Sequence, residues 1–320
     1  MFSRWLKFAA KAANRLPFRT TARRHAPATR AAPGPAGRFV RASYANRSGA
    51  RAYKTYVPAQ DERRPRPLVV MLHGCKQNAD DFAAGTRMNE LADEMGFVVA
   101  YPEQAVAANL SRCWNWFKSA NQERDHGEPS LIAGITREVI ARHNVDPRRV
   151  YIAGLSAGGA MAAIMGNLYP DLYAAIGIHS GLPFAAARDL PSALAAMRGL
   201  SATLDPRYHA AAFQAVPTIV FHGDLDTTVH SRNSERVIAQ ARPAAKDPVA
   251  PQTVEKGEES GRRYTRITQA DASGKIALEH WLVHGAGHAW SGGSKKGSFT
   301  DPRGPDATRA MLRFFLPASR

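Results

Sequence analysis

Short, predominantly apolar runs recur along this chain, and stretches with helical periodicity separate them. Apolar runs of four or five residues are typical of strands that are buried on both faces. They occupy residues 68–72, 97–101, 150–153, 174–178 and 218–221, and strand-like patterns also occur at 53–58 and 278–283. Helical patterns occupy 87–95, 130–143 and 157–168. This alternation predicts an α/β fold with a mostly parallel central sheet and helices on both faces.

The pattern keeps the same character from residue 43 to the end of the chain, which predicts one domain over residues 43–320. Residues 241–275 are polar and rich in Lys, Pro and Gly, so we expect a surface excursion there that is partly a hairpin. Residues 1–42 are different. They contain ten Lys and Arg and no acidic residue, and so contribute +10 of the chain's net charge of +16.

The first residues of this tail predict a short basic amphipathic helix, with Phe2, Trp5, Leu6 and Phe8 at roughly helical spacing. From about residue 17 to 37 the composition of Pro, Ala, Thr and Arg predicts a disordered linker. The tail is either a solvated arm or a segment that contacts an anionic or apolar surface. We do not expect nucleic-acid binding, because the body has no basic motif interleaved with aromatic residues.

Two features of the chain bear on membranes and secretion. No run of about 18 apolar residues exists, so no membrane span is expected. A secretory signal needs an uninterrupted apolar core of about 7 to 15 residues. Lys7, Lys11 and Arg15 interrupt any such core, which favours a cytoplasmic location.

A candidate nucleophile lies in the segment Gly154-Leu155-Ser156-Ala157-Gly158, which has the pattern G-x-S-x-G. A buried strand pattern leads into it and a small-residue helix pattern leaves it, as in the nucleophile elbow of α/β-hydrolases. The sharp turn needs residues without side chains two positions before and after the serine. Ser156 is therefore the predicted nucleophile, and an ordinary glycine-rich turn is the alternative.

The acid and the base should follow the serine in the order Ser, Asp or Glu, His, each after a sheet strand. Two acids follow the strand at 218–221, and we predict Asp226 because the loop needs several residues to turn back. Asp224 is then expected to stabilise a turn within its own loop. His288 is the predicted base, because it lies in a glycine-containing loop that can reach the serine.

In this interpretation the other histidines do not belong to the triad. His280, His284 and His288 are spaced by four, as in a metal-binding helix, but Gly285 and Gly287 break a helix and no Glu lies among them. We therefore expect neither a metal nor a cofactor, and His284 is expected to cap a strand. His73 and His222 are expected to be structural. His179, just past a strand, is expected to line the cleft.

Cleavage of an ester needs backbone N–H groups that stabilise the developing oxyanion. Ala157, directly after the nucleophile, is one predicted donor, and Cys75, in the loop after strand 68–72, is the other. Cys75 and Cys113 are the two cysteines of the chain, and they form either one bridge or two thiols. A bridge would favour an oxidising compartment.

Six segments resemble the esterase family of polyhydroxybutyrate (PHB) depolymerases, whose relatives include feruloyl and acetylxylan esterases. They are LHGC at 72–75, CWNW at 113–116, GLSAGG at 154–159, HGDLD at 222–226, GHAWSGG at 287–293 and TDPRGPDA at 300–307. The resemblance implies an α/β-hydrolase fold, the triad Ser156, Asp226 and His288, and Cys75 as oxyanion donor. It also suggests that Trp114 and Trp290 lie near the cleft and hold acyl chains, with core packing as the alternative.

The resemblance implies a serine esterase that acts on short hydroxyacyl esters, with feruloyl or acetylxylan esterase activity as the alternative. Secreted depolymerases of this family usually carry a linker and a polymer-binding domain after the catalytic one. The sequence ends at Arg320 without them, which favours soluble oligomers or an intracellular granule reached through the basic tail. An extracellular location is the alternative that the family implies.

Overall fold

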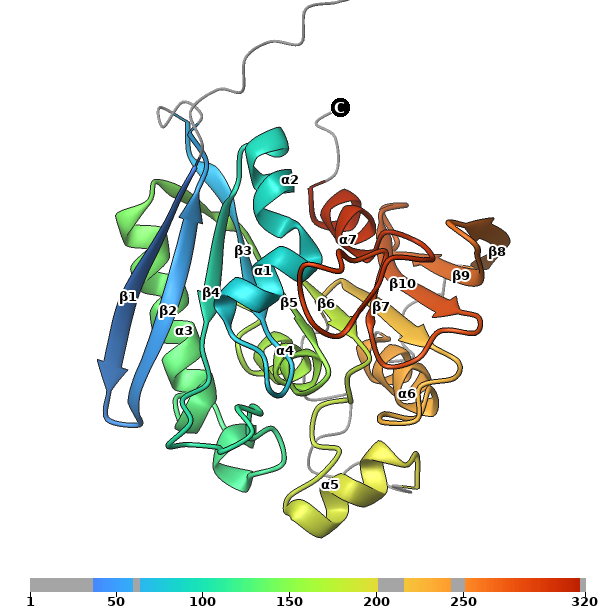
Figure 1. Ribbon diagram of the computed structural model, residues 1–320, viewed down its shortest axis with the longest axis horizontal. Helices are drawn as coiled ribbons and strands as arrows, with labels where there is room; N and C mark the ends of the chain where they lie inside the picture. Colours follow the sequence, from blue (N-terminus) through green and yellow to red (C-terminus); the bar gives the residue numbers. More distant parts are fainter. Residues whose placement is uncertain (1–36, 60–63, 201–215, 243–250, 317–320) are drawn as a thin grey trace, which may run out of the picture. The chain divides into compact units, whose positions relative to one another are not determined.

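The computed structural model describes residues 37–59, 64–200, 216–242 and 251–316 (Figure 1). The described residues form one ten-stranded sheet in the order β1-β2-β4-β3-β5-β6-β7-β10-β9-β8. Its strands are β1 Arg38–Asn46, β2 Gly49–Val57, β3 Arg66–Leu72, β4 Val98–Pro102, β5 Val145–Leu155, β6 Ala175–His179, β7 Thr218–Gly223, β8 Gln252–Glu259, β9 Arg262–Ala270 and β10 Ile276–Val283.

The six central strands, β4, β3, β5, β6, β7 and β10, are parallel to one another. Antiparallel pairs extend the sheet at both edges, β1 and β2 on one side and β9 and β8 on the other. Within the described ranges, the helices are α1 Ala79–Thr86, α2 Met88–Met95, α3 Gly127–Arg142, α4 Ala157–Leu168, α5 Leu190–Met197, α6 Arg232–Ala241 and α7 Ala307–Phe315, with a 3-10 turn at Ser119–Gln122. A two-stranded pair, β11 Trp290–Ser291 and β12 Thr300–Asp301, lies apart from the main sheet.

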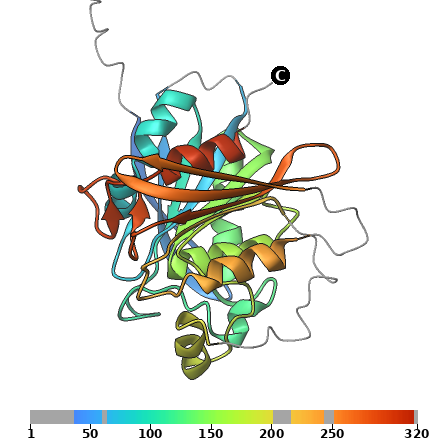
Figure 2. The ribbon, with the colours of Figure 1, turned by 90° about the vertical axis from the view of Figure 1, so that its right-hand side faces the viewer.

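The central strands are buried on both faces, as their continuous apolar runs predict. In β3, Leu68, Val70 and Leu72 belong to one hydrophobic cluster, and the alternate residues Val69 and Met71 belong to a second. Helices α3, α4 and α6 contribute to the first cluster, whereas α1, α2 and α7 contribute to the second. Figure 2 shows α7 and α6 on opposite sides of the sheet. The predicted α/β-hydrolase fold, a mostly parallel sheet covered on both faces, is confirmed.

Two details of the predicted organisation are corrected. Strand β1 begins at Arg38 and pairs with β2 over its whole length, so the tail does not extend to residue 42. Phe39 in this strand packs edge-on against Tyr56 and Tyr101, an interaction that the basic composition conceals. The excursion at 241–275 contains the hairpin β8–β9, but this hairpin also continues the main sheet from β10.

The predictions for residues 1–36 fall outside the described residues. Within the described residues, no helix has both the length and the apolar character needed to cross a bilayer. Because the central strands are parallel, their carboxyl ends meet at one edge of the sheet. The loops that leave this edge carry Ser156, Asp226 and His288.

Candidate active site

Ser156 lies at a sharp turn between β5 and α4. Its backbone has φ 58° and ψ −119°, a conformation that a non-glycine residue rarely adopts and that costs about 1–3 kcal/mol. The two flanking glycines make the turn possible. A Cβ on Gly154 would lie 2.3 Å from the carbonyl oxygen of Gly158, and a Cβ on Gly158 would lie 2.1 Å from that of Leu72. The elbow predicted from the G-x-S-x-G pattern is therefore present in the fold.

The backbone around Ser156 holds this turn in place. The N–H of Ser156 donates to the carbonyl of His179 at 2.9 Å, which ties the elbow to the end of β6. Ala157 is the first residue of α4, where backbone N–H groups have no partner within the helix. The positive end of the helix dipole also lies there. A negative charge that develops beside Ser156 would therefore be stabilised.

Asp226 and His288 form a hydrogen-bonded pair. His288 Nδ1 lies 2.7 Å from Asp226 Oδ2, and the two side chains are 12% and 0% exposed. The other carboxylate oxygen accepts the N–H groups of Thr228 at 2.9 Å and Val229 at 2.8 Å. Burial alone would raise the pKa of Asp226. Hydrogen bonds from His222, His288 and Val229 outweigh burial and hold this pKa well below its usual range.

His288 must reach back across the sheet, because β6 and β7 lie between β5 and β10. Neighbouring strands are about 4.8 Å apart, so the loop after β10 spans one strand spacing to meet Asp226, which follows β7, whereas β5, which leads into Ser156, lies three spacings away. Burial, followed by the nearby His222 and His288, lowers the pKa of His179 to about 3. The backbone carbonyl of the same His179 accepts the N–H of Ser156.

The rival acid and the rival histidine pair with each other. His284 Nδ1 lies 2.8 Å from Asp224 Oδ2, and His284 Nε2 lies 2.9 Å from Thr265 Oγ1. Asp224 also accepts the N–H of Gly285 at 2.7 Å. Asp224 therefore bonds to the neighbouring loop and not within its own, which corrects the expected turn-stabilising role. His284 bridges strand β9 and this loop.

The remaining histidines have separate partners. His280 Nε2 lies 2.9 Å from Ser234 Oγ, so the three histidines spaced by four do not converge. Within the described ranges, no group of three His, Cys, Asp or Glu side chains could hold a metal ion. His73 Nε2 accepts the N–H of Gln104 at 3.1 Å, and His222 Nε2 lies 2.7 Å from the carbonyl of Val229. His73 has the structural surroundings expected of it, whereas His222 Nε2 also lies 3.5 Å from Asp226 Oδ2 and so contacts the proposed acid.

The loop after β3 is linked to the loop after β4 by a disulfide between Cys75 and Cys113. The amides on either side of Cys75 are engaged. Gly74 N–H donates to Gln77 Oε1 at 2.9 Å, and Lys76 N–H donates to the carbonyl of Ser111 at 2.7 Å. The N–H of Cys75 itself has no acceptor among the described residues.

The expected substrate contacts of three residues are corrected by their burial. Trp114 and Trp290 are both 0% exposed, and Trp290 donates from Nε1 to Thr308 Oγ1 at 3.0 Å. His179 is 1% exposed, stacks on Trp290, and accepts the N–H of Ser291 on Nε2 at 3.0 Å. All three side chains pack in the core beneath the loops that carry the site, which was the alternative interpretation for the tryptophans.

Some functional contacts were not expected from the sequence. The backbone N–H groups of Thr228 and Val229 fix the carboxylate of Asp226. The bond to Thr228 is of the kind that Asp forms with the backbone two residues on, so the Asp itself was the available signal. Gln77 satisfies Gly74 beside the proposed oxyanion donor, and it also donates to Asp81 and Ser298. Gly74 and Asp81 are near Gln77 in the sequence, but Ser298 is 221 residues away, and this long-range contact has no local sequence signal.

Among solved structures, the chain is similar to an acetyl xylan esterase from Aspergillus awamori. The TM-score is 0.66 at 18% identity, and the match covers 83% of this chain and 93% of that one. A feruloyl esterase module from Clostridium thermocellum matches with a TM-score of 0.50 at 16% identity, over 82% of this chain and 86% of that one. At these identities the similarity concerns the fold.

The chain is also similar in sequence to curated esterases. It is 34% identical to poly(3-hydroxyalkanoate) depolymerase C of Paucimonas lemoignei over 182 residues, which cover 54% of this chain and 44% of that protein. It is 36% identical to feruloyl esterase B of Neurospora crassa over 132 residues, which cover 41% of this chain and 44% of that protein. The chain thus spans less than half the length of these relatives.

The family model described as esterase PHB depolymerase matches residues 51–244, which is more than half of the chain. This range includes the disulfide, the turn at Ser156 and Asp226. With the sheet order, the nucleophile elbow and the Asp–His pair in place, the match assigns the chain to the esterase PHB depolymerase family.

Proposed function

We propose that this protein hydrolyses carboxylic esters through the triad Ser156, His288 and Asp226. The observation that carries the proposal is the 2.7 Å contact between His288 Nδ1 and Asp226 Oδ2, at the sheet edge where the strained elbow presents Ser156. A strained serine at a helix N-terminus and a histidine oriented by a buried carboxylate are the components that activate a serine nucleophile.

The pairing sets the tautomer of His288. The pKa of Asp226 is held low, so its carboxylate is ionised and acts only as an acceptor. In the neutral imidazole the proton therefore lies on Nδ1 and the lone pair on Nε2. Nε2 can then accept the hydroxyl proton of Ser156 as Oγ attacks the ester carbonyl carbon.

In each half of the proposed reaction, His288 accepts one proton and then donates one proton. In the first half, a bond forms between Ser156 Oγ and the carbonyl carbon, the bond to the alkoxy oxygen breaks, and His288 protonates the departing alcohol. In the second half, a bond forms between a water oxygen and the acyl carbon while His288 takes the water proton. The bond to Ser156 Oγ then breaks, His288 returns the proton to Oγ, and the carboxylic acid leaves. The N–H groups of Ala157 and Cys75 stabilise the oxyanion in both halves.

For the substrate, we propose short hydroxyacyl esters of the type found in poly(3-hydroxybutyrate) and its oligomers. The support is the family assignment and the 34% identity to a relative named poly(3-hydroxyalkanoate) depolymerase C. Leu225, between the two acids, is 64% exposed and is suited to an apolar acyl segment.

Feruloyl or acetylxylan ester hydrolysis is the second candidate. A relative named feruloyl esterase B is 36% identical over 132 residues, and the fold matches an acetyl xylan esterase. The same triad serves either substrate. The difference depends on which acyl and alcohol groups fit around Ser156.

One pair of assays tests the activity and the substrate separately. A fluorophosphonate probe should label the wild-type protein on Ser156 and leave Ser156→Ala unlabelled, and equal labelling of both would refute the nucleophile. Release of products from hydroxybutyrate oligomers, feruloyl sugars and acetylated xylan is then compared by kcat/KM. The highest kcat/KM on feruloyl sugars or acetylated xylan would select the second candidate.

The disulfide bears on where the protein works. Bridges between cysteines persist in oxidising compartments and are rare in the reducing cytosol. We therefore favour an oxidising compartment over the cytoplasmic location expected from the N-terminal sequence. The basic tail remains a proposed contact for a polyester surface. Mass spectrometry of the unreduced protein tests the bridge, and two free thiols would remove this argument.

A further inference from the structure

We propose that Glu128 is a positioning residue for the oxyanion hole, acting on the Cys75 N–H through the loop at residues 104–115. The inference rests on the proposed function, because it concerns the donor that would stabilise the oxyanion. Glu128 lies at the start of α3, on a different element from any member of the triad. Its side chain is 6% exposed.

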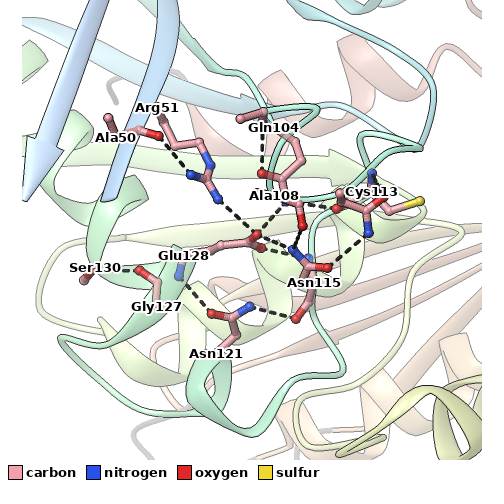
Figure 3. A network of polar contacts seen from close by, with 12 residues as sticks. Ala50, Arg51, Gln104, Ala108, Cys113, Asn115, Asn121, Gly127, Glu128 and Ser130 are labelled. Atoms are coloured by element: carbon pink, nitrogen blue, oxygen red, sulfur yellow. Dashed lines mark hydrogen bonds and ion pairs between the residues drawn. The ribbon is translucent and has the colours of Figure 1, made fainter. Parts of the chain in front are cut away.

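The carboxylate of Glu128 lies at the centre of a network of donors (Figure 3). Its Oε1 accepts from Gln104 Nε2 at 2.5 Å, from Asn115 Nδ2 at 2.7 Å and from Arg51 Nη2 at 3.2 Å. Its Oε2 accepts from the backbone N–H of Asn115 at 2.7 Å. Three of these four hydrogen bonds come from the two ends of the 104–115 loop, so the carboxylate fixes both ends.

The same loop is attached to the residues around Cys75 at three points. Cys113 forms the disulfide with Cys75 itself. The carbonyl of Ser111 accepts the N–H of Lys76 at 2.7 Å, and the N–H of Gln104 donates to His73 Nε2 at 3.1 Å. These contacts lie before, at and after the proposed oxyanion donor. A shift of the 104–115 loop would therefore move the Cys75 N–H with it.

A further contact joins the hydrogen bonds of Glu128 to the disulfide-bonded Cys113. Gln104 donates from Nε2 to the carbonyl of Cys113 at 2.9 Å as well as to Glu128. A buried carboxylate is costly unless donors surround it, so its partners cannot move independently. Oxyanion donors must lie within a fraction of an ångström of the developing charge, and a misplacement of about 1 Å can cost about a hundredfold in rate. Glu128 thus supplies rigidity where the reaction needs it.

The first test is Glu128→Gln, which keeps the size of the side chain. A glutamine presents an NH₂ group to partners that are all donors, so the loop must shift. We expect kcat on a soluble p-nitrophenyl ester to fall by about tenfold, with KM changed by less than about twofold. A trifluoromethyl ketone, which binds as an oxyanion, should lose affinity by the same factor as kcat. An unchanged kcat would overturn the inference.

A matched control separates positioning from general loss of stability. Glu279, on strand β10, is another buried carboxylate and is 1% exposed. It accepts from Arg266 on β9, Trp281 on β10 and Arg313 on α7. Glu279→Gln should lower the Tm by a similar amount but leave kcat and the ketone affinity unchanged. If Glu128→Gln and Glu279→Gln lower kcat equally, the effect is general destabilisation and the inference fails.

A double-mutant cycle tests the route through the loop. Cys75→Ser with Cys113→Ser removes one of the three attachments. In that background Glu128→Gln should lower log kcat by less than about half as much as it does in the wild-type protein, because the effects of coupled sites are not additive. Full additivity would overturn the route. If Glu128→Gln does not fold, Asn115→Ala replaces it, and we expect a smaller loss of kcat. An unchanged kcat in Asn115→Ala would contradict the inference.

The outcome is also distinguishable from a failure of the proposed function. Activity that persists in Ser156→Ala would refute the triad itself. An inactive Ser156→Ala together with a fully active Glu128→Gln would leave the triad standing and refute only the role of Glu128.

Discussion

His284 Nδ1 lies 2.8 Å from Asp224 Oδ2, so the residues that compete with the proposed acid and base in the sequence bind each other. This second pair joins the loop after β7 to the loop after β10. Beside it, the N–H of Leu225 donates to the carbonyl of Ala286 at 3.0 Å. The pair therefore braces the two loops at the point where they carry the proposed acid and base.

The two acids should differ sharply when each is replaced. Asp226→Asn turns an acceptor into a group that can donate to His288 Nδ1, which favours the wrong tautomer, and we expect kcat to fall by about ten-thousand-fold. Asp224→Asn keeps an acceptor for the N–H of Gly285 and should cost less than about tenfold. Kinetics on a p-nitrophenyl ester measure both. A larger loss in Asp224→Asn would exchange the roles of the two acids.

Removal of the nucleophile should abolish turnover without disturbing the fold. We expect Ser156→Ala to lower kcat by up to about a million-fold, because the members of a triad act as a unit. The Tm should not fall, since the alanine removes only a hydroxyl from the strained turn. Turnover within tenfold of the wild-type rate would contradict the assignment of Ser156.

The oxyanion donor at residue 75 can be tested with two variants that both lack the bridge. Cys75→Ala with Cys113→Ala keeps the N–H at residue 75, and its kcat should stay within about tenfold of the wild-type value. Cys75→Pro with Cys113→Ala removes that N–H, and kcat should fall by about a further hundredfold. Circular dichroism confirms that both variants fold. Equal activity of the two would exclude the Cys75 N–H as a donor.

Stability should decrease as the pH falls below about 6.5, because buried histidines resist protonation. Burial lowers the pKa of His280 to about 4, that of His179 to about 3, and that of His73 to below its usual value. The unfolded chain therefore binds these protons first. Each such histidine should lower the free energy of unfolding by about 1.4 kcal/mol per pH unit between its folded and unfolded pKa values.

Urea unfolding between pH 7 and pH 5 measures this slope. The low pKa of Asp226 does not contribute there, since its stabilisation is lost only below the unfolded value near pH 3.8. His280→Gln should flatten the slope, and His126→Gln, at an exposed position, controls for the removal of a histidine. A slope unchanged by His280→Gln would contradict the role of burial at this residue.

Deletion of the tail should separate surface binding from catalysis, provided that it ends before β1. A variant without residues 1–36 loses eight positive charges, and its turnover of a soluble ester should stay within about twofold. Its binding to polyester granules should weaken, and the binding of the full chain should fade as salt screens the charges. Equal granule binding with and without residues 1–36 would leave the solvated arm as the remaining interpretation.

A longer deletion provides the matched comparison. Removal of residues 1–42 also cuts the first half of β1 and exposes Tyr56 and Tyr101, which Phe39 contacts. We expect a lower Tm for this variant than for the shorter deletion. Equal Tm values would mean that the first half of β1 contributes little to the sheet.

Local chemistry in the sequence determined the central sheet and the sharp turn at Ser156. A buried parallel strand needs apolar residues on both faces, so its apolar run is visible without its neighbours. The elbow needs glycines on either side of Ser156, because side chains there would collide with backbone. These constraints act within a few residues, which is why the pattern reveals them.

Only the tertiary structure decided how distant segments meet. Two acids and two histidines lie close together in the sequence, and the choice of partner depends on how the loops after β7 and β10 cross. The bridge between Cys75 and Cys113, the burial of Trp114 and the pairing of β1 likewise depend on contacts across the fold. A local pattern encodes the conformation of its own segment, whereas burial and pairing are properties of the surfaces that the folded chain brings together.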